Sequence, residues 1–135
     1  MTDIEKAYLA GIIDGEGSIM LVVKRSGWYR RPVISVASSD IELLDWIKAT
    51  TGTGSIVPKR KKRAAHHRDS WQWRAKDDKA LEIIRLVSPY LKITRKRKRA
   101  ELLISRYKAV TPHNGWYTEE GRKLKEEFEA EFAGL

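Results

Sequence analysis

Two carboxylates alternate with two glycines near the start of the chain, in the segment Asp14-Gly15-Glu16-Gly17. At the end of a helix, this segment would place a carboxylate beside backbone carbonyls that no longer have helical partners. Carboxylate and carbonyl oxygens are the hard ligands that Mg²⁺ and similar divalent cations prefer. The residues alone allow two interpretations: a divalent-metal site at a helix end, or polar residues that close a helix with glycine C-caps.

The preceding residues predict the helix that would carry this segment. Thr2 or Asp3 can act as its N-cap, and an apolar run follows up to the glycines. A capping residue followed by such a run is the usual start of a helix. We therefore expect a helix over residues 3–15, with a break at Gly15 and Gly17.

Small residues along this helix, at Ala7, Ala10 and Gly11, would leave a groove on one face and let two copies of the helix approach closely. Two Glu16 carboxylates would then lie near each other, and they would repel unless cations lay between them. Cations beside paired carboxylates are the arrangement that two-metal hydrolysis of a phosphodiester uses. The helix therefore predicts a site that two chains complete together.

Residues 9–17, Leu-Ala-Gly-Ile-Ile-Asp-Gly-Glu-Gly, resemble the nine-residue signature of the LAGLIDADG homing endonucleases. Glu16 stands where the signature has Asp, which keeps the carboxylate and lengthens its reach by one methylene. Residues 52–56, at the entry to a predicted hairpin, and residues 89–93, before a basic helix, are also similar to that family. The resemblance spans residues 4–107.

The resemblance implies an α+β homing-endonuclease fold of order α-β-β-α-β-β-α, with helices on one face of an antiparallel DNA-binding sheet. It implies a site-specific endonuclease that hydrolyses phosphodiester bonds of double-stranded DNA with Mg²⁺, or another divalent cation such as Mn²⁺. Staggered breaks at a long, near-palindromic target and intron or intein mobility are implied as well. Because one copy of the signature is present, the resemblance also implies a two-fold homodimer. Its interface is expected at Ala7, Ala10, Gly11 and Asp14.

The same resemblance assigns the active-site residues. Glu16 is expected to be catalytic and to bind the metal, and the Gly15 carbonyl is expected to be a second metal ligand. Lys96 is expected to be the basic residue near the scissile phosphate, with Lys98 as the alternative register. The position that often carries a polar, water-organising residue falls at residues 38–39, which are both serine.

Alternating polar and apolar residues predict two hairpins, with strands over residues 18–25, 30–38, 54–61 and 69–76. Apolar residues at helical spacing predict further helices, from residue 40 to the residue before Gly52, from residue 77 or 78 to residue 87, over residues 96–110 and from residue 118 onward. The resulting order is α-β-β-α-β-β-α-α-α. We expect a single domain over residues 1–135, in which residues 118–135 form an acidic C-terminal helix.

The same patterns predict which side chains form the core. Trp71 and Trp73 alternate with polar neighbours and are expected to face inward. In the last helix, Leu124, Phe128 and Phe132 recur at a spacing of four residues, which predicts a buried stripe.

The sheet face away from the helices is expected to read bases, because Arg and Lys suit guanine and Gln suits adenine in the major groove. The residues predicted to bind DNA there are Lys24, Arg31, Ser35, Ser55, Lys59, Lys61, Ser70, Gln72 and Arg74. The cationic loop 62–68 and residues 95–99 are expected to contact phosphates instead. His66 and His67 in that loop lack a carboxylate at ligand spacing, so zinc is not expected.

Charge is unevenly distributed along the 135 residues, which carry 27 Lys+Arg against 18 Asp+Glu for a net charge of +9. Residues 118–135 hold three cationic residues and six glutamates, a net of −3, so the first 117 residues carry +12. The cations of this body gather at residues 24–31, 59–68 and 92–99. Three cationic clusters in a small domain indicate a polyanionic partner, with nucleic acid first.

Composition excludes several other classes. Without cysteine there is no disulfide, Cys-ligated zinc, iron–sulfur cluster or thiol nucleophile. No apolar run approaches the roughly 20 residues of a membrane span, and no signal-peptide pattern is present, so we expect a soluble, intracellular protein with no membrane partner. Two alternatives remain: a noncatalytic DNA- or RNA-binding protein of the same fold, such as a splicing maturase or transcription factor, and a basic protein on an anionic membrane. The polar strands offer no amphipathic anchor for the latter.

Overall fold

Four strands form one antiparallel sheet in the computed structural model, which describes residues 1–59 and 69–135. The strands are β1 (Gly17–Val23), β2 (Arg30–Ser38), β3 (Ser55–Lys59) and β4 (Ser70–Lys76), in the spatial order β1-β2-β4-β3. Both predicted hairpins are confirmed, although β1 ends two residues earlier than expected. The end of the third predicted strand, at residues 60–61, lies outside the described residues.

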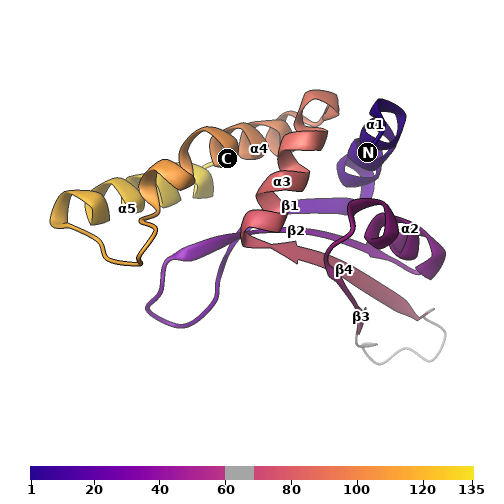
Figure 1. Cartoon of the computed structure of the whole chain (residues 1–135), viewed down its shortest axis with the longest axis horizontal. Helices are drawn as coiled ribbons and strands as arrows, with labels where there is room; N and C mark the ends of the chain where they lie inside the picture. Colours follow the sequence, from indigo (N-terminus) through magenta and orange to yellow (C-terminus); the bar gives the residue numbers. More distant parts are fainter. Residues whose placement is uncertain (60–68) are drawn as a thin grey trace.

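Among the described residues, five α-helices accompany the sheet: α1 (Asp3–Glu16), α2 (Ile41–Thr51), α3 (Asp77–Val87), α4 (Thr94–Arg106) and α5 (Glu119–Ala133). The predicted α+β class and element order are confirmed. Residues 108–110, expected as the end of the fourth helix, form a separate 3₁₀ turn instead. Helices α1, α2 and α3 lie over one face of the sheet, and α4 and α5 extend toward the end of the molecule farthest from α1 (Figure 1). None of the described helices is long and apolar enough to cross a membrane.

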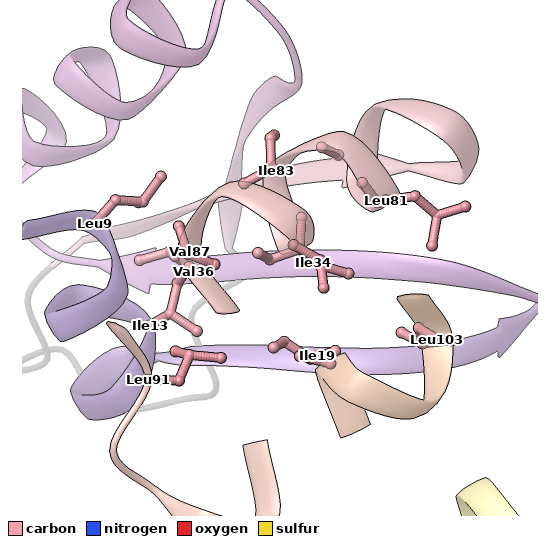
Figure 2. Close-up of a cluster of buried hydrophobic side chains, with 14 of the residues drawn as sticks. Leu9, Ile13, Ile19, Ile34, Val36, Leu81, Ile83, Val87, Leu91 and Leu103 are labelled. Atoms are coloured by element: carbon pink, nitrogen blue, oxygen red, sulfur yellow. The ribbon is translucent and has the colours of Figure 1, made fainter. Parts of the chain in front are cut away.

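The core lies between the helices and one face of the sheet. Strand register places Ile19, Ile34 and Ala75 in one row across β1, β2 and β4, and all three are buried. Figure 2 shows side chains from α1, β1, β2, α3 and α4 meeting in this cluster, with Leu9 and Ile13 contributed by α1. Because successive strand residues face opposite ways, burying this row leaves the alternate residues on the open face.

The backbone just before β3 packs closely against the indole ring of Trp73. Trp73 is fully buried, as predicted, and its indole Nε1 donates a hydrogen bond to the carbonyl of Thr53 at 3.0 Å. Gly54 adopts φ +93°, and a Cβ atom there would lie 2.2 Å from the indole Nε1. Both the positive φ and this contact require glycine. Trp71, the other predicted core tryptophan, is partly buried against the same core.

One face of α5 differs from the prediction. Phe128 and Phe132 are buried as expected, but Leu124 is exposed and Lys125 is only 1% exposed. The helix is rotated so that residues 125, 128 and 132 face the body. The Lys125 ammonium donates to Thr111 Oγ1 at 2.6 Å and lies 4.2 Å from the centre of the Tyr107 ring. These contacts partly replace water around the buried charge.

Burial lowers the pKa of Lys125 to about 8 because the charged form is desolvated. The unfolded chain has an ordinary lysine pKa of about 10.4. The folded state therefore binds fewer protons between these two values, and stability rises with pH through this window. Below pH 8 Lys125 is charged in both the folded and the unfolded state, so the free energy of unfolding is lowered by the full cost of burying the charge. Above about pH 10.4 the side chain is neutral in both states and this cost is absent.

We therefore expect Lys125→Met to be more stable than the wild type at pH 7 by about 1–3 kcal/mol, a gap that shrinks between pH 8 and about pH 10.4. Urea denaturation across this pH range measures it. Lys123→Met, at an exposed position of the same helix, is the matched control and should show no such gap. A Lys125→Met protein that is less stable than the wild type at pH 7 would contradict the desolvation argument.

Candidate active site and nucleic-acid interface

The carboxylate of Glu16 lies at the exposed C-terminal tip of α1, one residue beyond the predicted helix end. The chain leaves the helix at once, because Gly17 is extended and its N–H donates to the Ile13 carbonyl. A Cβ atom on Gly17 would lie 2.7 Å from Ile13 Cα, so this tight exit requires glycine. Among the described residues, no side chain binds the Glu16 carboxylate. It is therefore presented to solvent on a rigid support.

Lys96 holds the end of α1 from the other side. Its Nζ donates to the carbonyls of Ile13 at 2.8 Å and Asp14 at 2.7 Å. These are carbonyls of the last turn, where orphan acceptors and the partial negative charge of the helix dipole are located. An ammonium has three donors, so one N–H of Lys96 is left for another acceptor. Lys96, predicted as the basic residue near the scissile phosphate, therefore lies at the Glu16 end of α1.

Asp14 makes a second connection to the same region. Its carboxylate accepts hydrogen bonds from the backbone N–H groups of Lys92 at 2.9 Å and Ile93 at 3.1 Å, just before α4. The family resemblance assigned Asp14 to the helix junction and the dimer interface, and the structure shows its side chain in a junction within the chain. Asp14 and Lys96 thus tie the end of α1 to the start of α4 by bonds in opposite directions.

The donor set at this tip suits a hard cation. The last turn of α1 contains no basic residue and ends with two carboxylates, and Lys96 from α4 reduces its negative potential. Glu16 and the Gly15 carbonyl offer oxygen ligands of the type that Mg²⁺ or Mn²⁺ prefers. Within residues 1–59 and 69–135 no group of three or more His, Asp or Glu side chains could hold a metal.

The open face of the sheet carries a polar row. Strand register aligns Ser18, Ser35, Arg74 and Ser55 across β1, β2, β4 and β3. Ser55 is exposed and Arg74 is partly exposed. Ser35, in the central strand β2, is only 5% exposed, which does not suit its predicted role as a base contact. The Nε of Arg74 is buried without a hydrogen-bond partner among the described residues.

The other predicted DNA-binding residues of this face differ in how exposed they are. Gln72 and Ser70 are partly exposed in β4, and Lys59 is exposed opposite Ser70. Lys24 is exposed just beyond the end of β1. Lys61 lies outside the described residues.

Arg31 is committed to an intramolecular ion pair. Its guanidinium binds the Asp77 carboxylate with two nitrogens, with Nε 3.0 Å from Oδ1. Asp77 opens α3 with a positive φ of 56°, a conformation that few side chains adopt. The pair thus fixes the β4–α3 corner, which differs from the predicted role of Arg31 in reading bases.

The surface of α1 that points away from the core is apolar or small. Ile4 is 82% exposed and Tyr8 is 56% exposed, and Gly11 and Gly15 continue the same face. Ala7 is exposed as the interface prediction requires, but Ala10 is fully buried in the chain's own core. Sequence reasoning missed Ile4 and Tyr8, although their spacing with the two glycines (4, 8, 11, 15) marks one helix face.

The profile of the LAGLIDADG endonuclease family matches residues 9–107. The chain therefore belongs to the LAGLIDADG endonuclease family, as its sequence signature indicated.

Solved structures of DNA complexes share the fold. The homing endonuclease I-CvuI in complex with the I-CreI target has a TM-score of 0.66 and 21% identity, over 94% of this chain and 81% of that one. The archaeal intron-encoded homing endonuclease I-Vdi141I complexed with DNA gives 0.57 and 21%, over 96% and 84%. I-GzeII, a LAGLIDADG homing endonuclease in complex with its DNA target, gives 0.69 and 24%, over 96% of this chain and 44% of that one. No curated protein matches the chain significantly.

The two hydrogen bonds of Lys96 lead to a stability prediction. We expect Lys96→Met to lower the free energy of unfolding by about 1–3 kcal/mol, because the Asp14 carbonyl loses this charged donor and the Ile13 carbonyl keeps only the Gly17 N–H. Hydrogen exchange should accelerate at the Gly17 amide, which closes the last turn. Lys98→Met is the control at an exposed neighbour, where we expect a change within about 0.5 kcal/mol. Equal effects of the two substitutions in urea denaturation would show that Lys96 does not hold α1.

Proposed function

We propose that this protein is a metal-dependent, site-specific DNA endonuclease that acts as a homodimer and cleaves a near-palindromic double-stranded target. The observation that carries the proposal is the Glu16 carboxylate, which has no partner among the described residues and lies at the tip of a helix that Lys96 and Asp14 tie to the start of α4. A carboxylate that served only to keep the surface soluble would not need a helix end fixed by the hydrogen bonds of Lys96 and Asp14. Membership of the LAGLIDADG endonuclease family supports the same assignment.

In this proposal each residue at the tip has a separate task. Glu16 and the Gly15 carbonyl hold the divalent cation, Mg²⁺ or Mn²⁺, and Lys96 is a positioning residue whose remaining N–H faces the phosphate. When bound, the cation would promote deprotonation of water and neutralise charge on the phosphate. Lys98, which makes no contact with α1 among the bonds described, becomes the weaker candidate for the basic residue.

DNA would bind to the open face of the sheet. Arg74 supports this placement, because its Nε has no partner in the part of the chain that the structure describes and a base or phosphate oxygen would supply one. Gln72, Ser55, Ser70 and Lys59 flank it on the same face. The solved DNA complexes of I-CvuI and I-Vdi141I, with which the chain shares its fold, support a double-stranded DNA partner.

The exposed face of α1 supports the homodimer. Ile4 and Tyr8 are large apolar side chains on a surface that a monomer would leave in water. Gly11 and Gly15 would let two backbones approach closely at the two-fold axis. This contact would bring two Glu16 residues together and complete the coordination that one chain lacks.

A noncatalytic nucleic-acid-binding protein of the same fold is the second candidate. It shares the basic body and the polar sheet face, so DNA binding alone does not separate the two. The exposed Glu16 and its support favour the endonuclease, because a binding protein has no need of a carboxylate facing the phosphates. Cleavage is therefore the deciding observation.

With Mg²⁺, the wild type should cut members of a randomised palindromic DNA library, and sequencing the cut ends would give target and stagger together. Glu16→Gln should bind selected targets with similar affinity and cut them about 100-fold more slowly or worse, since even residues that only support metal ligands are worth about 10- to 100-fold. Glu127→Gln, an exposed carboxamide substitution in α5, is the control and should cut normally. Binding without any cutting by the wild type would favour the noncatalytic candidate.

The interface can be tested at Gly11, where an added Cβ has no neighbour within 4 Å. Gly11→Leu should leave the monomer folded but raise the dissociation constant of the dimer on target DNA by about tenfold or more, because the extra side chain separates the helices. Ala109→Leu, at an exposed site on the 3₁₀ turn after α4, controls for added apolar surface. Sedimentation of protein–DNA complexes measures both. A wild-type monomer on its target, or an unaffected Gly11→Leu dimer, would reject this interface.

A further inference from the structure

A cavity of about 410 Å³ lies far from α1, between the β1–β2 connection and the segment that joins α4 to α5. Figure 1 places both segments at the end of the molecule opposite α1. Neither Glu16 nor Lys96 lines the cavity, so the proposed cleavage site does not account for it. Its volume falls in the range of small-molecule sites.

Aromatic side chains form much of the wall. Trp28 lies on the hairpin connection with its indole exposed, and the Arg25 guanidinium lies 5.1 Å from the ring centre. The Tyr29 and Tyr117 rings lie 4.8 Å apart between centres. Burial raises the pKa of Tyr117, which keeps its phenol neutral and able to donate a hydrogen bond. A planar ring could stack against this wall and find polar partners at its edge.

The charge of the lining is positive. Four cationic side chains, Lys24, Arg30, Arg31 and Lys125, face a single carboxylate, that of Asp77. Arg31 already binds that carboxylate with two nitrogens, so Asp77 contributes little free negative charge. Glu129 adjoins the site, where its carboxylate accepts the backbone N–H of Arg30 at 2.8 Å, but it does not line the cavity. The cavity therefore attracts an anion.

Lys125 supplies the strongest reason to expect that anion. The ammonium is buried, has Thr111 Oγ1 as its hydrogen-bond acceptor, and forms no ion pair with a carboxylate in the described part of the chain. An ammonium has three donors. The Glu129 carboxylate attracts this charge without bonding to it, and a buried charge without a bonded counter-ion is costly to the fold. An anion in the cavity would offset that cost.

We propose that this cavity binds a nucleoside phosphate, with the base stacked on Trp28 and the phosphate near Lys24 and above the buried charge of Lys125. Base–aromatic stacking combined with cationic groups is the usual chemistry of unstacked nucleotides on proteins. The nucleotide could be free in solution or could be an unpaired nucleotide at the end of a bound DNA strand. Binding here does not depend on cleavage by Glu16, so the two proposals can fail separately.

The probe for the experiment is 2-aminopurine deoxyriboside 5′-monophosphate, whose fluorescence is quenched by stacking. The wild type should quench it saturably and bind it at least about tenfold more tightly than the same nucleoside without phosphate. Trp28→Ala should weaken both ligands about tenfold. Lys125→Met should weaken the nucleotide severalfold and leave the nucleoside unchanged. Trp116→Ala, a highly exposed tryptophan outside the cavity lining, is the matched control.

Two further arms separate the sources of the nucleotide. If the ligand is a DNA end, a duplex with a single 2-aminopurine overhang should bind more tightly than the free nucleotide, as measured by quenching. If the ligand is a free nucleotide, the duplex should bind no more tightly. A blunt duplex with the probe paired inside is the reference. Circular dichroism checks folding of each variant, and Lys24→Met provides a second charge variant. Equal affinity for nucleoside and nucleotide, or quenching that Trp28→Ala and Trp116→Ala change equally, would overturn the proposal.

Discussion

The carboxylate of Asp14 and the ammonium of Lys96 bind the end of α1 to the start of α4 in opposite directions. Asp14 accepts two backbone N–H groups before α4, and Lys96 from α4 donates to two carbonyls at the end of α1. Each bond is charge-assisted and therefore stronger than a neutral hydrogen bond. Together they fix the direction in which Glu16 leaves the helix. The strand β1 starts at the next residue, so the same clamp sets the position of the sheet relative to the carboxylate.

The fold was predictable where local chemistry and burial agree. Alternation identified all four strands, and Gly52 ends α2 with a φ of +70° as its type suggests. At the start of α1, Thr2 and Glu5 form a reciprocal capping box, so the predicted N-cap is also confirmed. These features depend on residues a few positions apart. Sequence spacing alone is enough to find them.

The parts that could not be predicted depend on contacts between distant segments. Residue spacing could not show that Arg31 pairs with Asp77, because they lie 46 positions apart and meet only when β2 and β4 form the same sheet. The burial of Lys125 in place of Leu124 has a similar cause: the rotation of α5 is set by Tyr107 and Thr111, which the helix pattern does not contain. At the site, the family resemblance singled out Glu16 and Lys96, and the structure brings both residues to the same end of α1. It did not reveal that Ala10 faces inward while Ile4 and Tyr8 face outward.

The net charge of the chain has to be considered together with the geometry of α1. The acidic α5 is held to the basic body, since Glu131 pairs with Arg106 and Glu129 accepts from the backbone of Arg30. The first 117 residues carry a net charge of +12, while α1 ends in two carboxylates. In the proposed dimer, two such helix ends would meet and repel, so cations would stabilise the association of the chains as well as the chemistry. Metal binding and dimer formation are then thermodynamically linked. The positively charged body that attracts DNA would surround a metal site that is complete only when the cation is bound and the two chains are paired.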